Sequence, residues 1–303
     1  MRKTTALAAL AAVAALTLSG CAGGDPLAAD GGGEGSSGDS IIIGSADFTE
    51  SQLIATIYSQ TLQAAGVEVT EQFNIGSREV YMVALQDGSI DLLPEYAGAL
   101  LKYLNPESTV STTEDVVAEL DTVLPDGVSL LEAAEAQDKD ILAVTQETAD
   151  AYGLETISDL EPVAAELSLG GPPEWATRVN GVAGLRDVYG LEFKEFVPLD
   201  AGGPLTMTAL TSGQVQVGDI FSTDPGLTSN NLVALEDDKS LFAAENVVPV
   251  ITTAKSSDLV EETLNAVSAE LTTADLIAMN TEAGTGANLA DIATAWLESK
   301  GLI

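Results

Sequence analysis

From Ile41 onward, short apolar segments typical of strands alternate with segments whose apolar residues recur at helical spacing. The first strand is expected at 41–44. A helix follows with a capping box at 49–52 and a stop at Gly66, and a second strand is expected at 67–75. Parallel strands are usually joined by a crossover helix. The alternation therefore predicts an α/β fold with largely parallel strand pairing.

A second helix is expected to be capped by Ser77, to run through Leu85 and to stop at Gly88. A strand follows at 90–93, and the chain leaves it at 94–98. The sequence ALQDGSIDL at 84–92 has a weak echo in ALTSGQVQV at 209–217. Each reads as a helix end, a glycine stop and an alternating strand.

Continuing the register of this echo places Tyr96 opposite Phe221. The echo therefore predicts two similar lobes that face one cleft, each with an aromatic residue just past a strand. Chance similarity is the alternative, because such short units are common.

The middle of the chain then forms one lobe inserted into the other. We expect lobe I at 41–140 and 247–303, and lobe II at 141–246. In the tail, apolar residues repeat at intervals of three and four. This predicts helices that pack back on lobe I, at 259–271, 273–279 and 289–297.

The N-terminus has the organisation of a secretory signal peptide at 1–20, with two basic residues, an apolar run and a small-residue cleavage site. The order Leu-Ser-Gly-Cys at 18–21 resembles a bacterial lipobox, which implies that Cys21 carries a lipid. Cys21 is the only cysteine, which suits acylation better than a disulfide or a metal. A glycine-rich tether at 21–40 follows. A transmembrane anchor that happens to contain a cysteine is the alternative.

The chain carries 47 acidic and 11 basic side chains, for a formal net charge of −36. No basic patch is available to neutralise phosphates, which excludes nucleic acid as a partner. The acidity indicates a solvated surface or, alternatively, acids that line a site for a cation. The absence of histidine excludes Ser-His-Asp and Cys-His catalysis and histidine-ligated zinc.

Six segments in order give the chain a resemblance to the substrate-binding proteins of ABC importers for glycine betaine, choline and related osmoprotectants. They are GSADFTE at 44–50, GSREV at 76–80, DLLPEYAG at 91–98, GPPEW at 171–175, YGL at 189–191 and FSTD at 221–224. The similarity extends over the whole mature domain.

The resemblance implies a two-lobed α/β fold of the periplasmic-binding-protein type (type II), with two interlobe crossovers. It also implies an extracytoplasmic, lipid-anchored solute receptor at the outer face of the cytoplasmic membrane. The expected partners are a small solute and the permease and ATPase subunits as separate chains, with the receptor a monomer. No cofactor, metal or catalytic residue is expected.

Aromatic faces hold quaternary ammonium groups by cation–π attraction, and a ligand carboxylate needs basic side chains or backbone N–H groups. By resemblance, Tyr96 and Phe221 are the aromatic walls of the two lobes. Arg178 matches an arginine that can reach a ligand carboxylate, or pair with a nearby acid. Trp175 stands where phenylalanine is common and could add a ring. Core packing is the alternative for the rings, and an exposed side chain for Arg178.

The sequence also departs from the family pattern at the expected site. Ala46 stands where lysine is common and Ala99 where threonine is common, and both family residues serve the carboxylate end. Family tyrosines align with the segment containing Asp138 and Asp140, and with Glu245. The substitutions remove carboxylate-binding groups and add carboxylates. They predict a cation without a carboxylate, such as choline or another amine, in preference to glycine betaine.

Two other functions remain open from the sequence. A lobe-pair sensor or scaffold lipoprotein would keep the fold without transport. A hydrolase that uses paired carboxylates is the enzymatic alternative, which the missing histidine and metal patterns disfavour.

Overall fold

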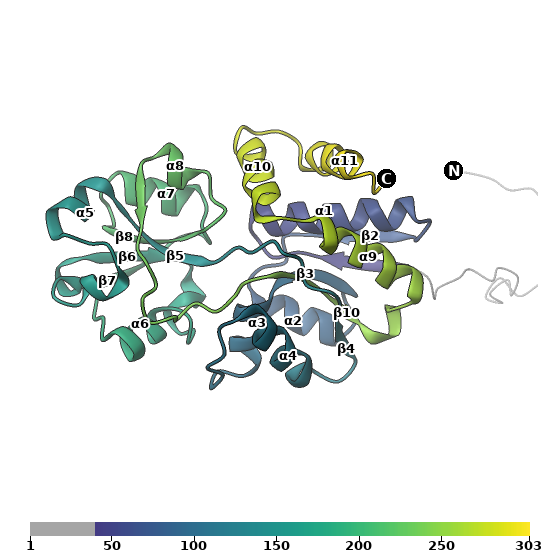
Figure 1. Cartoon of the computed structure of the whole chain (residues 1–303), viewed down its shortest axis with the longest axis horizontal. Helices are drawn as coiled ribbons and strands as arrows, with labels where there is room; N and C mark the ends of the chain where they lie inside the picture. Colours follow the sequence, from purple (N-terminus) through teal and green to yellow (C-terminus); the bar gives the residue numbers. More distant parts are fainter. Residues whose placement is uncertain (1–39) are drawn as a thin grey trace, which may run out of the picture. The chain divides into compact units, whose positions relative to one another are not determined.

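The computed structural model describes residues 40–303. The predicted signal peptide, Cys21 and the tether up to residue 39 lie outside the described residues. The described part contains two five-stranded sheets, each with helices on both faces (Figure 1). We call the unit around the first sheet lobe I and the unit around the second sheet lobe II.

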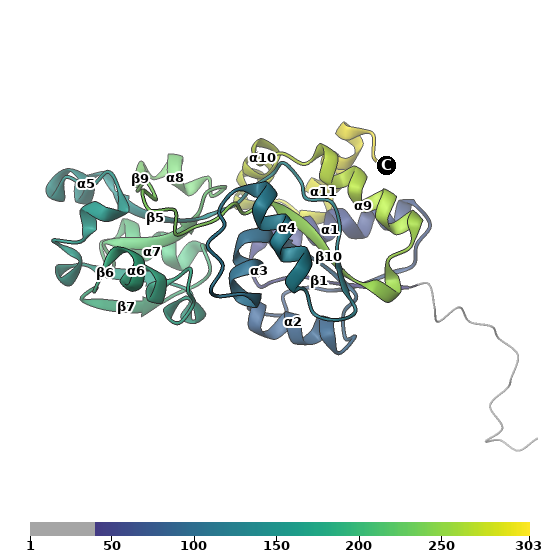
Figure 2. The same ribbon diagram turned by 60° about the horizontal axis from the view of Figure 1, so that its bottom comes forward.

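Lobe I has its core on both faces of the first sheet. Helices α1, α9, α10 and α11 cover one face, and α2, α3 and α4 cover the other (Figures 1 and 2). The strand order is β2 (Val69–Gln72), β1 (Ile41–Gly44), β3 (Leu92–Tyr96), β10 (Val247–Thr252), β4 (Val128–Leu130). The helices are α1 (Thr49–Ala64), α2 (Arg78–Gln86), α3 (Ala97–Leu104), α4 (Thr113–Val123), α9 (Asp258–Glu270), α10 (Thr273–Gly284) and α11 (Leu289–Lys300).

Lobe II repeats this three-layer arrangement around the second sheet, with α7 and α6 on opposite faces (Figure 1). The strand order is β7 (Glu195–Pro198), β6 (Ser168–Gly171), β8 (Val217–Phe221), β5 (Asp140–Thr145), β9 (Leu232–Ala234). The helices are α5 (Gln146–Tyr152), α6 (Val182–Tyr189), α7 (Pro204–Thr211) and α8 (Gly226–Ser229), with 3-10 turns η1 (Ile157–Leu160), η2 (Ala164–Glu166) and η3 (Pro173–Ala176); η4 (Thr253–Lys255) belongs to lobe I.

The chain passes between the sheets twice, between β4 and β5 and again between β9 and β10. The two passing segments meet at a β-bridge between Gln137 and Asn246. Strands β5 and β10 enter their sheets from the other lobe, and both run antiparallel to their neighbours. The prediction of largely parallel pairing is therefore correct for only half of the strand pairs, those of β1 with β2 and β3 and of β6 with β7 and β8. Local alternation of strands and helices cannot predict the direction of a strand that arrives from another lobe.

The sequence echo corresponds to a shared backbone turn. Gly88 and Gly213 both have positive φ, 79° and 76°. In both units the first apolar residue after the turn donates its N–H back to the last helical turn: Ile90 to Ala84 and Val215 to Ala209, each at 3.1 Å. The strands that follow, β3 and β8, end at Tyr96 and Phe221. Equivalent turns therefore carry these two rings to the same ends of the two sheets.

Two local predictions are wrong. Helix α1 begins at Thr49 and has Phe48 as its N-cap, so the expected cap Thr49 is already inside the helix and no side-chain capping bond forms. The strand expected at 90–93 begins later and includes Pro94. Proline is tolerated there because β1 pairs with β3 only at Leu92, so no ladder bond to β1 is needed at Pro94.

The tail forms the expected helices, each within a few residues of the predicted bounds. Leu264, Met279 and Trp296, one from each helix, belong to the same core as Ile43 and Leu53 of lobe I. Burial of these side chains against α1 is what holds the tail, since each contributes about 1.5–3 kcal/mol of transfer free energy.

Candidate functional site

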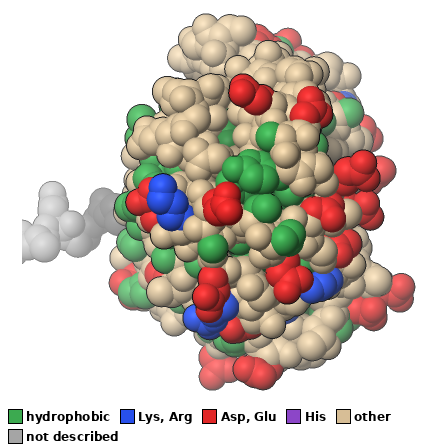
Figure 3. Space-filling model, turned by 90° about the vertical axis from the view of Figure 1, so that its left-hand side faces the viewer, with side chains coloured by type: hydrophobic (Ala, Val, Ile, Leu, Met, Phe, Trp, Pro, Cys, Tyr) green, Lys and Arg blue, Asp and Glu red, His purple; other side chains and the backbone are tan. Residues whose placement is uncertain are grey.

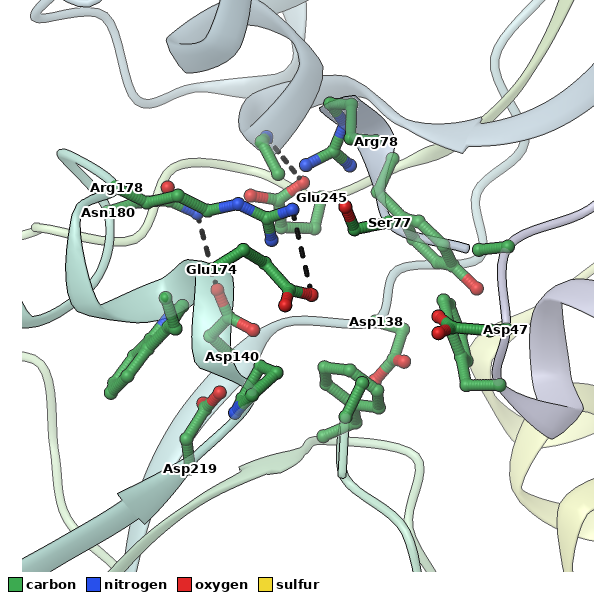
Figure 4. A pocket seen from close by; sticks show the side chains of 18 of the residues that line it. Asp47, Ser77, Arg78, Asp138, Asp140, Glu174, Arg178, Asn180, Asp219 and Glu245 are labelled. Atoms are coloured by element: carbon green, nitrogen blue, oxygen red, sulfur yellow. Dashed lines mark hydrogen bonds and ion pairs between the residues drawn. The ribbon is translucent and has the colours of Figure 1, made fainter. Parts of the chain in front are cut away.

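A pocket lies between the two lobes and encloses about 640 Å³ of space, part of it open to solvent. Both lobes contribute side chains from strand ends and from the turns that follow them (Figure 4). All seven ligand-binding residues predicted from the sequence line this pocket: Tyr96, Asp138, Asp140, Trp175, Arg178, Phe221 and Glu245. The substituted positions Ala46 and Ala99 line it as well.

An aromatic cluster spans the two lobes. The Phe48 ring lies 5.9 Å from that of Tyr96 and 5.2 Å from that of Phe221, centroid to centroid, in tilted geometry. Phe48 is the ring that sequence reasoning missed. Its position within the GSADFTE segment, directly before the first residue of α1, is the signal that could have found it.

The Tyr96 hydroxyl belongs to a hydrogen-bond network that joins the lobes. It donates to the Glu50 carboxylate at 2.7 Å. The other Glu50 oxygen accepts from the Thr223 hydroxyl of lobe II at 2.6 Å and from the Asn280 amide at 2.5 Å. Glu50 is 4% exposed, so these donors satisfy a carboxylate removed from water. The network fixes the Tyr96 ring beside Phe48.

Trp175 has two environments. Its ring stacks on Phe242 in the core of lobe II, with centroids 6.5 Å apart and planes inclined by 11°. It also lines the pocket, although the residue is only 1% exposed. Both readings of this residue from the sequence therefore describe part of its environment.

Two arginines line the pocket, and one of them, Arg78, was not predicted as a site residue from the sequence. Arg78 forms a two-pronged ion pair with Glu95, at 2.8 Å for both bonds, and Tyr81 donates to the same carboxylate at 2.9 Å. Glu95 is fully buried and Arg78 is 6% exposed. The guanidinium is therefore committed to a carboxylate of its own lobe.

Arg178 connects the lobes rather than reaching one of the acids considered from the sequence. Its Nε and Nη2 atoms donate to the two Glu79 oxygens of α2 at 3.0 and 2.9 Å, and Glu174 lies 3.9 Å away. Burial alone would raise the pKa of Glu79, but hydrogen bonds from Arg178 and Ser77 lower it to about 2. Glu79 lies on the GSREV segment, and its role as an interlobe partner was missed.

Four carboxylic acids lie buried or nearly buried in the pocket, and burial raises the pKa of each: Asp138, Asp140, Asp219 and Glu245. Asp138 accepts from the Ser222 hydroxyl at 3.1 Å and the Thr223 N–H at 3.0 Å, and the charge of Glu50 raises its pKa further. Asp140 accepts from the Asn180 amide at 3.3 Å. Asp219, which the sequence did not single out, has no hydrogen-bond partner on either oxygen within the described part of the chain.

Glu245 occupies the N-terminal end of α3. One oxygen accepts the Ala99 N–H at 2.9 Å. The approach requires a glycine at 98, because a Cβ there would lie 2.7 Å from the other oxygen. Burial raises the pKa of Glu245 to about 8, partly offset by that N–H bond. A helix N-terminus presents free N–H donors, and here one of them is already bound by a side chain of the protein.

Within residues 40–303 no cluster of acidic side chains has the arrangement of a metal site. The same residues contain no helix with the length and apolar character needed to span a membrane. Acidic side chains are spread over the end of lobe II, with few basic ones between them (Figure 3).

Two α/β lobes, two crossing segments and a pocket walled by rings from both lobes define a two-lobed solute-binding protein. Residues 39–299 match the family of substrate-binding domains of ABC-type glycine betaine transport systems, and the chain belongs to that family. It is a substrate-binding receptor of an ABC transporter. Proteins of this family act outside the cytoplasm and deliver small solutes to a permease.

Among curated proteins, a glycine-betaine-binding protein of Pseudomonas aeruginosa is 30% identical over 227 residues, which cover 70% of this chain and 71% of that protein. A carnitine transport binding protein of Listeria monocytogenes is 28% identical and covers 82% of both chains. These similarities confirm the resemblance inferred from the six segments.

Solved structures confirm the fold. A glycine betaine/carnitine/choline ABC transporter protein has a TM-score of 0.68 at 24% identity, covering 86% of this chain and 99% of the other. A choline-binding protein in complex with choline has a TM-score of 0.65 at 16% identity, covering 88% and 91%.

Proposed function

We propose that this receptor binds a small quaternary ammonium cation without a carboxylate, such as choline, in preference to glycine betaine. We further propose that a lipid on Cys21 holds the receptor at the outer face of the cytoplasmic membrane.

The receptor acts there as a monomer without catalytic activity, and the permease and ATPase are separate chains. The sensor or scaffold alternative has no observation in its favour.

The charge of the pocket carries the ligand proposal. Six acidic side chains and two arginines line it. Both arginines are already paired with carboxylates, Arg78 with Glu95 and Arg178 with Glu79. A cation entering this pocket gains Coulomb attraction that grows as water is excluded, whereas a ligand carboxylate meets like charges.

The position of Glu245 also favours a ligand without a carboxylate. The family resemblance places the carboxylate end of a betaine near position 99, where this chain has alanine. The Ala99 N–H that remains donates to Glu245. A ligand carboxylate would have to displace an internal carboxylate from the end of α3, and the displaced group would stay buried without a donor.

The aromatic rings of the pocket favour a ligand with a cationic head group. Phe48, Tyr96 and Phe221 form a continuous apolar wall in the pocket. Each cation–π contact contributes about 0.5–2 kcal/mol. Glycine betaine, carnitine and choline occur in the names of the similar proteins, and of these three only choline lacks a carboxylate.

Isothermal titration calorimetry of choline and glycine betaine with one preparation of the protein tests this proposal. We expect choline to bind at least about tenfold more tightly, the equivalent of about 1.4 kcal/mol. Tighter binding of glycine betaine would overturn the proposed ligand class and leave the family assignment intact.

A further inference from the structure

Among the described residues, Asp219 is the one fully buried acid of the pocket whose side chain has no hydrogen-bond partner. The residue is fully buried, and neither of its oxygens has a hydrogen-bond partner within residues 40–303. An ionised carboxylate removed from water without a donor costs several kcal/mol, and even the protonated acid loses its hydrogen bonds to water there. A buried acid without a partner in the protein is therefore expected to have another role, such as binding a ligand.

The geometry of lobe II directs Asp219 toward the ligand space. In the antiparallel pair of β5 and β8, Asp140 lies opposite Phe221 and Leu142 lies opposite Asp219. Side chains alternate along a strand, so Asp140, Asp219 and Phe221 are on one face of the sheet. All three line the pocket, and Figure 4 shows the carboxylates of Asp140 and Asp219 on the same side of it.

The spacing of these groups sets the length of a ligand that could use them. Residues two apart on a strand are separated by about 7 Å. A cation against the Phe221 ring is therefore separated from Asp219 by roughly a two-carbon linker plus one hydrogen bond of about 2.7–3 Å. A trimethylammonium group alone cannot use Asp219, because it has no N–H or O–H to donate.

We propose that the ligand carries a hydrogen-bond donor, a hydroxyl or a protonated amine, about two carbons from its cationic head, and that this donor binds Asp219. The inference rests on the proposed function and narrows it from quaternary ammonium ions in general to those with a donor at the far end. Asp140, on the same face, is close enough to add attraction for a charged donor.

Three cations of the form X–CH2–CH2–N(CH3)3+ test the inference by calorimetry: choline with a hydroxyl, the 2-aminoethyl compound with an ammonium, and the propyl compound with a methyl group. They share the head and the linker. We expect both donor-bearing cations to bind at least about tenfold more tightly than the propyl compound, as a hydrogen bond to a charged group requires. Of these two cations, the one with the higher affinity shows whether the donor is a hydroxyl or an ammonium group.

Asp219→Asn should reduce this preference at least about threefold, because a neutral acceptor forms a weaker bond. Asp47→Asn is the control: Asp47 also lines the pocket but is exposed, so its removal should lower the three affinities by similar factors and preserve the preference. If Asp219→Asn does not fold, the wild-type series alone decides.

Equal binding of all three cations by the wild type, or an unchanged preference in Asp219→Asn, would overturn the inference and leave the proposed function standing. Absence of binding by all three would overturn both.

Discussion

Phe48 of lobe I and Phe221 of lobe II are in direct ring contact, with centroids 5.2 Å apart and planes inclined by 50°. The Tyr96 ring also lies 5.9 Å from that of Phe48, so one ring connects the aromatic walls of both lobes. A cation held by this cluster therefore contacts both lobes at once, which gives binding a direct means of favouring the closed arrangement.

Phe48→Ala should weaken choline binding between about threefold and thirtyfold, because one cation–π contact of about 0.5–2 kcal/mol is lost. Calorimetry measures the affinity. Phe193→Ala is the matched control, since Phe193 is also a half-buried phenylalanine but packs on the core of lobe II outside the interlobe pocket. Equal losses in both variants would show that the effect of Phe48 is on folding alone.

Glu245→Ala should shift the preference toward glycine betaine. The substitution frees the Ala99 N–H at the start of α3 and removes the buried acid that occupies this donor in place of a ligand carboxylate. We expect the ratio of choline to glycine betaine affinity to fall at least about tenfold, the scale of one charge-assisted hydrogen bond. An unchanged ratio would remove Glu245 from the account of specificity.

The affinity for choline should rise with pH. Burial raises the pKa of Glu245 to about 8, so below that pH Glu245 is protonated in the empty pocket. Binding of a cation favours the ionised form, so this proton must be released. Asp140 and Glu95 raise this pKa and Arg78 lowers it. Calorimetry from pH 6 to 9 should show a steeper rise in the wild type than in Glu245→Gln. Identical profiles would contradict the assignment.

The same shift predicts that the ligand-free protein loses stability as pH rises. Between the unfolded pKa of about 4.3 and the folded value of about 8, the native state binds the proton that the unfolded chain has released. The free energy of unfolding should therefore fall by up to about 1.4 kcal/mol per pH unit from this group. Denaturant titration of the wild type and Glu245→Gln across this window measures the difference.

Arg178→Gln should change the affinities for choline and glycine betaine by similar factors. Arg178 donates to Glu79 and not to the ligand space, and the Glu79 side chain is 42% exposed, so loss of the pair should cost less than about 1 kcal/mol of stability. Arg186→Gln, which breaks a surface pair with Asp187, is the control. Selective loss of glycine betaine binding would show that Arg178 holds a ligand carboxylate.

Cys21→Ala should release the protein from the membrane or leave it unprocessed, because the lipobox-like sequence at 18–21 provides one acylation site. Cell fractionation and mass spectrometry of the N-terminal peptide measure both outcomes. A mature wild-type protein with an unmodified Cys21 would contradict the lipid anchor.

Much of the fold and of the pocket lining could be predicted because the signals are local. Helical spacing in 259–297, the glycine stops at 88 and 213 and the six ordered segments do not depend on distant partners. Strand direction is different. β5 and β10 are antiparallel to their neighbours because each arrives from the other lobe, and no short segment contains that information.

The sequence by itself determined the α/β class, the two-lobed family and the excess of acids on which the proposal of a cationic ligand rests. The tertiary structure alone decided which of those acids are paired within the protein and which are left without a partner. Glu95 is paired with Arg78, Glu245 is bound at the end of α3, and Asp219 has no hydrogen-bond partner within residues 40–303. The physical reason is that the energy of a charge depends on its burial and on the groups within a few ångströms, which come from segments far apart in the chain.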